Sequence, residues 1–203
     1  MWERARGNAE ACDPFRSRTG SIREKVMRLA LMIAAGTTLA LGACAREEMA
    51  TGTPMAGGAK AVASLRTADG TDVGRATATE VAGGLRFTVD GMSMPVGTHG
   101  VHVHAVGRCD APAFTTAGGH WNPTGRKHGA MNPQGPHEGD LPNLVVDSGG
   151  RGTIGATVPG ATMAGLMDAD GAAFIVHAKA DDLMTDPSGN SGDRIACGVF
   201  QPA

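Results

Sequence analysis

Hydrophobic and polar residues alternate along several short stretches of the chain. In the stretch 85–92, "LRFTVDGM", every second residue is apolar, so one face of a strand would carry Leu85, Phe87 and Val89 and the other face would be polar. Stretches of similar character, separated by Gly, Asp, Asn and Pro, lie at 61–81, 98–107, 143–158, 172–180 and 195–200. No long stretch keeps the 3.6-residue apolar period of a helix. The pattern therefore predicts an all-β domain over residues 60–203.

Two long segments do not fit a strand. Residues 107–141 are rich in Gly and Pro, and residues 181–193 read "DDLMTDPSGNSGD". Segments of this length inside a compact domain are usually functional or disordered. We therefore expect two long functional loops on the β domain.

The residues before this domain have the character of an export signal. The apolar run "LALMIAAGTTLALGAC" follows a basic stretch and is too short to span a bilayer comfortably, but it suits the apolar part of a secretory signal. The run closes on small residues before Cys44, which resembles the lipobox of bacterial lipoproteins. We therefore expect a lipoprotein signal at 27–43, lipidation of Cys44 and a flexible Gly-rich tether at 44–59. The alternative is an ordinary signal peptide that is cleaved nearby.

Met27 begins a signal of normal form by itself. Residues 1–26 are therefore expected to be an upstream extension from a start site assigned too early, in which case Cys12 would be absent from the protein in the cell. The expected location is the bacterial cell envelope, in the periplasm, as a lipoprotein held to a membrane through Cys44.

Charge and cysteine content narrow the range of partners. From Cys44 onward the chain has 160 residues, in which 11 Lys and Arg stand against 16 Asp and Glu, a formal net charge of −5. This balance argues against a nucleic-acid partner. Two further cysteines, Cys109 and Cys197, are candidates for a disulfide in the oxidising periplasm, with two free buried thiols as the alternative.

The histidines are concentrated in a few places. In "HGVHVH", residues 99–104, a strand would place His102 and His104 on one face, close enough for both to reach one metal ion, although two satisfied surface histidines are the alternative. The remaining members of the set of seven lie in the first long segment or just before the second: His120, His128, His137 and His177. Three of these histidines, His120, His128 and His137, lie in the first long segment together with Asp140. Three imidazoles and one carboxylate make a plausible tetrahedral zinc set.

Six motifs carry a resemblance to a known family. "HGVHVH", "GGHWNP", "RKHGA", "HEGDLPN", "VHAKADDL" and "GDRIACGV", in this order, resemble the copper/zinc superoxide dismutases, over about residues 60–200. The resemblance implies an eight-stranded Greek-key β-barrel or sandwich. It implies copper ligands at His102, His104, His120 and His177. It also implies zinc ligands at His120, His128, His137 and Asp140, so that His120 would bridge the two metals as an imidazolate.

The resemblance also implies roles for residues that are not ligands. Asp181 would hydrogen-bond ligands of both metals, and Arg194 would be the active-site arginine beside copper. Alone, Asp181 could be only a turn former and Arg194 only a solvated charge. Cys109 and Cys197 would form the disulfide that ties the metal loop to the barrel, and His99 would be a hydrogen-bonded histidine that binds no metal.

The activity that the resemblance implies is dismutation of the superoxide anion, with His120 and Arg194 as catalytic residues. Besides Asp181, the second long segment contains Asp182, Asp186 and Asp193 and no lysine. Steering of the anion would therefore rest on Arg194, the metals and lysines from elsewhere, such as Lys127 or Lys179. A copper-carrying lipoprotein without turnover and a structural lipoprotein with a vestigial site are the alternatives. A homodimer is also an expectation, and the sequence does not choose its face.

Overall fold

The computed structural model describes residues 57–203. The predicted upstream extension, signal, lipidated Cys44 and most of the tether lie outside the described residues. Within residues 57–203 no helix is long and apolar enough to cross a membrane.

The described part is built almost entirely from β-strands, as predicted. Besides a single 3₁₀ turn, η1 (Thr115–Ala117), and a four-residue helix, α1 (Met163–Leu166), it contains these strands: β1 (Lys60–Arg66), β2 (Asp72–Val81), β3 (Gly84–Gly91), β4 (Gly97–His99), β5 (Val101–His104), β6 (Leu144–Val146), β7 (Gly152–Pro159), β8 (Ala173–His177), β9 (Arg194–Val199) and β10 (Gln201–Pro202). The helix was not predicted from the sequence. It is too short to show an apolar period, and its start is fixed locally by Thr162, whose hydroxyl accepts the N–H of Gly165.

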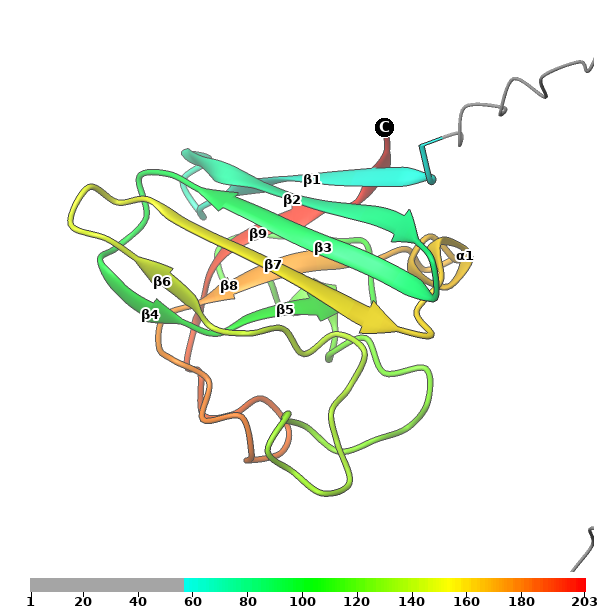
Figure 1. The fold of residues 1–203 in the computed structure, drawn as a ribbon. Helices are drawn as coiled ribbons and strands as arrows, with labels where there is room; N and C mark the ends of the chain where they lie inside the picture. Colours follow the sequence, from blue (N-terminus) through cyan, green and yellow to red (C-terminus); the bar gives the residue numbers. More distant parts are fainter. Residues whose placement is uncertain (1–56) are drawn as a thin grey trace, which may run out of the picture. The chain divides into compact units, whose positions relative to one another are not determined.

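The strands form one curled antiparallel sheet of eight strands (Figure 1). Its order is β5-β8-β9-β1-β2-β3-β7, with β10 also paired to β1, so that β5 and β7 lie at the two edges. The separate pair β4–β6 lies between these edges, because β4 precedes β5 by one residue and β6 packs beside β7. Together these elements form the barrel-like all-β fold that the resemblance implies.

Alternation along β3 places its apolar side chains inside this sheet. Leu85, Phe87 and Val89 are fully buried, whereas Arg86 and Asp90 between them are exposed. The ring of Phe200 packs edge-on against Phe87, with centroids 6.1 Å apart. The predicted face of this strand is therefore confirmed.

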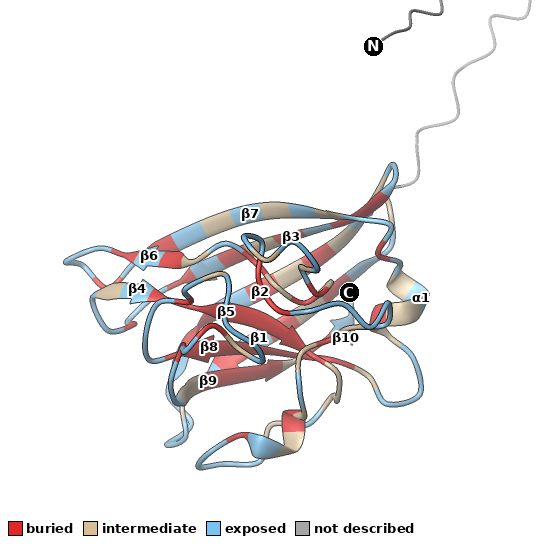
Figure 2. Cartoon of the chain, turned by 90° about the horizontal axis from the view of Figure 1, so that it is seen from below, coloured by how far each residue is buried: buried red, intermediate tan, exposed pale blue. Residues whose placement is uncertain are grey.

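Strands β5 and β8 differ from β3 because both of their faces are buried (Figure 2). Val101 and Val103 of β5 belong to the main core, whereas His102 and His104 point to the opposite face. On that face, His102 lies opposite Ile175 of β8 in the strand register. Ile175 packs with Cys197 in a second, smaller hydrophobic cluster. The two long loops cover this outer face, so they must be folded against the barrel.

A single strand was expected over residues 98–107, but the structure divides it at Gly100. The N–H of Gly100 donates to Lys179 O (2.7 Å), and a Cβ at this position would lie 2.9 Å from the Cβ of Ser191 and 3.2 Å from that of Asp181. The division therefore results from close contact with the second loop, which sequence alternation cannot show.

Candidate metal centre

The first long loop returns along the free edge of β5. The N–H of Trp121 donates to Val103 O (2.8 Å) and the N–H of Val103 donates to Gly139 O (2.9 Å). These bonds place His120 opposite His104 and Asp140 opposite His102 in strand-like register. Loop residues separated by twenty positions thus come to lie beside the two histidines of β5.

Four histidines meet on this outer face, and we call them the four-histidine group: His102, His104, His120 and His177. Each offers a ring nitrogen, and these nitrogens lie within 4.8 Å of one another. Two come from β5, one from the first loop and one from the end of β8. The structure therefore brings together all four residues predicted to bind copper.

In each ring of this group, the nitrogen that faces the others has no hydrogen-bond partner among residues 57–203. These buried atoms are His102 Nδ1, His104 Nε2, His120 Nε2 and His177 Nε2. Buried polar atoms are rarely left unpaired, so four of them facing one point require an explanation. A metal ion bound by four imidazoles provides one, because each neutral ring offers a lone pair.

In three of these rings, the other nitrogen is held by a fixed acceptor. His104 Nδ1 donates to Gly118 O (2.9 Å) and His177 Nδ1 donates to Gly192 O (3.0 Å). His102 Nε2 donates to Asp181 Oδ2 (2.7 Å). These bonds place the proton on the far side of the ring and leave the inward nitrogen free to bind a metal.

Burial keeps these rings neutral. It lowers the pKa of His102 to about 3, that of His104 to about 2 and that of His177 to about 4. Burial also lowers the pKa of His120. A metal ion that binds the inward nitrogens therefore does not have to displace protons from them near neutral pH.

A second group, which we call the His–Asp group, contains His120, His128, His137 and Asp140. The Nδ1 atoms of its three histidines lie 2.8, 3.0 and 3.2 Å from Asp140 Oδ1, in the order His120, His128, His137. The Nδ1 atoms of His120 and His137 are 3.3 Å apart. Ligands on a tetrahedron around zinc are spaced by about 3.3 Å, given Zn–N distances of about 2.0 Å. The predicted zinc ligands thus have the spacing that the metal requires.

His102 also lies close to part of this group: one donor atom of each of His102, His120, His128 and Asp140 lies within 4.8 Å of the others. We nevertheless assign His137 to the His–Asp group, because its Nδ1 is close to both His120 and Asp140. The Nε2 of His102 already donates to Asp181, and its Nδ1 belongs to the four-histidine group.

Asp181 joins the two groups. Its Oδ2 accepts from His102 Nε2 (2.7 Å), and its Oδ1 accepts from His128 Nε2 (3.0 Å). The carboxylate is fully buried. Asn143 holds the backbone of Asp181 from both sides: its amide donates to Asp181 O (2.9 Å) and its carbonyl accepts from Asp181 N (2.8 Å). The predicted role of Asp181 as a shared hydrogen-bond partner matches this geometry.

The two carboxylates of the centre remain ionised. Burial opposes their charge, but hydrogen bonds from His120 and His128 hold the pKa of Asp140 well below its usual range, and bonds from His102 and His128 do the same for the pKa of Asp181. Burial likewise opposes a charge on His128, yet the two carboxylates raise its pKa to about 9. Asp140 and Asp181 together therefore outweigh the single positive charge of His128, so the centre is suited to a divalent cation.

Arg194 lies beside the four-histidine group. Its guanidinium donates to Phe114 O and Gly118 O, both at 2.7 Å, and Gly118 O also accepts from His104. Burial lowers the pKa of this guanidinium from its ordinary value. The loop that supplies these carbonyls is tied to β9 by the predicted disulfide between Cys109 and Cys197, which the structure contains.

A pocket opens beside this arginine, and we call it the Arg194 pocket. It has a volume of about 410 Å³ and is lined by residues of the first loop and of the start of β9: Pro112, Ala113, Thr115, Gly192, Asp193 and Arg194. The carbonyl of Gly192 in its wall accepts from His177. The pocket therefore lies next to the four-histidine group through Gly192, although none of the four histidines lines it.

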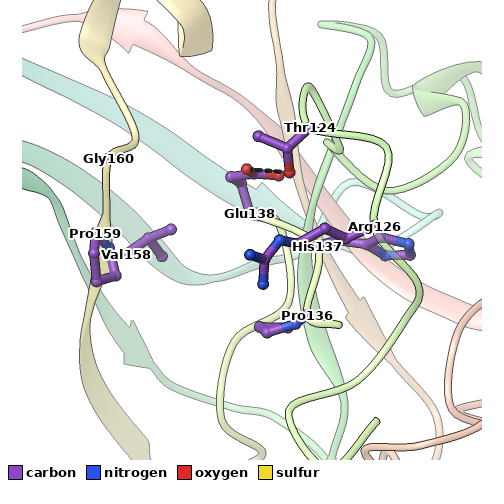
Figure 3. A pocket seen from close by; sticks show the side chains of 8 residues that line it. All are labelled: Thr124, Arg126, Pro136, His137, Glu138, Val158, Pro159 and Gly160. Carbon is purple, nitrogen blue, oxygen red and sulfur yellow. Dashed lines mark hydrogen bonds between the residues drawn. The ribbon is translucent and has the colours of Figure 1, made fainter. Parts of the chain in front are cut away.

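Another cavity, of about 450 Å³, lies near the His–Asp group (Figure 3). Thr124 donates to Glu138 (2.6 Å) on one side, and Val158 and Pro159 lie across from them (Figure 3). His137 is in its wall, but no residue of the four-histidine group lines it.

His99 has the structural role that was expected. Its Nδ1 faces His177 O and its Nε2 faces Pro95 O, both at 2.8 Å, and neither atom points into a metal group. Asn143 and Gly118 were not predicted from the sequence. The side chain of Asn143 bonds the backbone N–H and C=O of Asp181, and Gly118 O accepts from both His104 and Arg194. The only local sign of Asn143 is its position immediately before β6, where a side chain can bond backbone of a neighbouring segment.

Comparison with known proteins fits this geometry. The family model described as copper/zinc superoxide dismutase matches residues 73–200. The chain belongs to the copper/zinc superoxide dismutase family. A copper/zinc superoxide dismutase of Aquifex aeolicus is 37% identical over 148 residues, covering 70% of this chain and 86% of the relative. Another, from Escherichia coli K12, is 38% identical over 144 residues, covering 65% of this chain and 80% of the relative.

Solved structures of superoxide dismutase-like proteins share the fold. A protein of this description from Bacillus subtilis matches with a TM-score of 0.65 and 37% identity, over 69% of this chain and 97% of the other. The copper/zinc superoxide dismutase of Brucella abortus matches with a TM-score of 0.58 and 28% identity, over 70% and 99% of the two chains. The chain is thus an enzyme of the copper/zinc superoxide dismutase type, with copper and zinc as its cofactors.

Proposed function

We propose that this chain converts two superoxide anions and two protons into oxygen and hydrogen peroxide, with copper in the four-histidine group and zinc in the His–Asp group. The single observation that carries this assignment is the set of four buried ring nitrogens that face one another without a partner among the described residues. Imidazole nitrogens suit copper, and three nitrogens with one carboxylate suit zinc. Copper, when bound, supplies one-electron oxidation and reduction, whereas zinc supplies fixed positive charge and geometry.

His120 belongs to both groups, through Nε2 in the four-histidine group and through Nδ1 in the His–Asp group. Its ring can therefore be shared between the two sites as an imidazolate. It can also hold a proton on Nε2 and release that proton toward peroxide as it forms. The proposed catalytic role of His120 is this proton transfer at Nε2.

Arg194 would bind the substrate anion. Two of its N–H groups are fixed by Phe114 O and Gly118 O, so the guanidinium keeps one orientation and has further N–H groups for a ligand. Its fixed positive charge in the pocket wall favours a small anion over neutral oxygen or peroxide.

Steering of superoxide from a distance would depend on Lys179 more than on Lys127. Lys127 forms an ion pair with Asp186 (2.8 Å), which cancels most of its field. The stem of Lys179 runs beside Gly192 of the Arg194 pocket, since a Cβ at Gly192 would lie 3.4 Å from Lys179 Cδ. With so few cations available, we expect only a weak decrease of the rate with added salt.

The proposed setting is the periplasm, where a lipid on Cys44 would hold the enzyme to a membrane and the enzyme would remove superoxide outside the cytoplasm. The disulfide between Cys109 and Cys197 supports an oxidising compartment. Mass spectrometry of the protein from a membrane fraction would test the lipid on Cys44, and a protein that keeps its first 43 residues would contradict it.

The activity is tested by loading the full-length chain with copper and zinc together, or with zinc alone, and measuring superoxide consumption and metal content. We expect one copper and one zinc per chain in the first sample and rapid consumption, which the zinc-only sample lacks. Bound copper without turnover would contradict the proposed activity and favour a copper carrier.

A further inference from the structure

The Arg194 pocket has two opposite charges in its wall. Arg194 is half-buried and bonded to two backbone carbonyls, whereas Asp193, the residue before it, is exposed in the same pocket wall. The other lining residues carry no charge. An anion that enters this pocket therefore meets an attractive and a repulsive group side by side.

Within residues 57–203 the carboxylate of Asp193 has no ion-pair or hydrogen-bond partner. Other acidic residues of the two long loops differ: Asp110 pairs with Arg108 (2.6 Å), and Asp186 pairs with Lys127 (2.8 Å). Asp182 accepts the N–H groups of Met184 and Thr185. Each of these three carboxylates therefore has an ion-pair partner or accepts backbone hydrogen bonds, and the Asp193 carboxylate has neither.

We propose that Asp193 is a specificity-determining residue that weakens the binding of inert anions in the Arg194 pocket. This proposal rests on the proposed function, because it takes Arg194 as the group that receives the substrate anion. The competing ligands are small monovalent or divalent anions that bind beside Arg194 without reacting.

Asp193 is expected to affect substrate and inhibitor differently, because turnover depends on how often superoxide arrives, whereas inhibition depends on how long an inert anion stays bound. Superoxide is consumed when it arrives, so its rate depends mainly on the capture step. An inert anion inhibits only while it stays bound, so its effect depends on the whole binding free energy. Repulsion from Asp193 at short range therefore reduces inhibition by inert anions more than it reduces turnover.

The test compares two substitutions that remove the same charge from the full-length, copper- and zinc-loaded chain. Asp193→Asn removes the carboxylate in the pocket. Asp170→Asn is the control, because Asp170 is an exposed acid in the turn before β8, at the end of that strand opposite to His177, and lines no part of the Arg194 pocket. The probe is azide, a monovalent anion that binds copper(II), and its dissociation constant is followed by visible absorption, which requires no turnover.

We expect Asp193→Asn to tighten azide binding roughly three- to tenfold, the range for one unit charge at short distance in a partly solvated pocket. The second-order rate for superoxide should rise by a smaller factor, and Asp170→Asn should change neither value appreciably. Equal shifts in both variants would overturn the proposal, because they would show an effect of net charge alone. Unchanged azide binding in Asp193→Asn would also overturn it.

Failure of the proposed function would appear differently. In that case the wild-type chain would bind copper and azide but would not consume superoxide, while the azide constants would still report on Asp193. A variant Asp193→Ser, which is also neutral but smaller, should reproduce the tighter azide binding. If it does not, the effect in Asp193→Asn comes from the new amide and the proposal is wrong.

Discussion

At the scale of single residues, the site depends on what lies behind each ligand. The far nitrogens of His102 and His128 both bond Asp181, so one carboxylate fixes the ring orientation in both groups. The family resemblance predicted this role for Asp181, and the sequence alone could not, because Asp181 is distant in sequence from both histidines. The alternation in 99–104 correctly placed His102 and His104 on one face, since that depends only on the pleat of a strand.

Replacing Asp181 should weaken both metals together. In Asp181→Ala, the Nε2 atoms of His102 and His128 lose their acceptor in a buried environment, so both rings can turn. We expect the affinity for zinc and for copper to fall roughly 10- to 100-fold each. Competition with a chelator measures both affinities. A loss confined to one metal would contradict the shared role.

Asn143 forms no hydrogen bond with a metal-binding histidine itself and acts through the backbone of Asp181. Asn143→Ala removes both bonds to the backbone of Asp181, and we expect metal affinity to fall in the same direction as in Asp181→Ala but by a smaller factor. Asn132→Ala is the matched control, because Asn132 also bonds the second loop, at Met184 O, but does not touch Asp181. Chelator competition in both variants separates a specific effect on Asp181 from a general loosening of the loop, which would lower affinity equally in the two.

At the scale of elements, the free edge of β5 organises the first loop. The N–H of Trp121 donates to Val103 O and the N–H of Val103 donates to Gly139 O, so the loop pairs with this strand, and His120 and Asp140 lie beside β5. The long loops could be predicted from their Gly and Pro content. Their path could not, because it depends on backbone pairing between segments far apart in the chain.

The disulfide should stabilise this arrangement strongly. It closes a separation of 88 residues, and the chain-entropy relation gives about 4 to 5 kcal/mol for a loop of this length. The double variant Cys109→Ser, Cys197→Ser should therefore lose about that much free energy of unfolding in the metal-free state, measured by denaturant titration. The control is wild-type protein treated with a thiol reductant, which should approach the same value. Equal stability of the oxidised wild type and the double variant would show that the bond adds nothing.

At the scale of the whole molecule, the barrel is a rigid support on which histidines from three segments converge. The main core lies on one face of β5 and β8, and the metal groups lie on the other. The all-β class followed from alternation and turn residues. The closure of the sheet by β4 and β6 did not, since three-residue strands carry too little pattern.

Removing the metals should lower the stability of the described domain as a whole. Without them, four buried ring nitrogens have no partner, and the ligands of the folded state bind ions that the unfolded chain holds weakly. We expect metal-free protein to unfold at a clearly lower temperature in calorimetry, with full recovery on adding both ions. Equal melting temperatures with and without the ions would contradict strong binding in this centre.

The proposed activity requires one histidine, His120, to be shared by a copper group and a zinc group that together dismutate superoxide. The most direct measurement is superoxide consumption per bound copper by the full-length chain and by His120→Ala, with the metal content of each sample determined. We expect rapid consumption by the wild type with one copper and one zinc per chain, and loss of most of that activity per copper in the variant. Equal activity per copper in the two proteins, or a wild type that binds both metals without turnover, would contradict it.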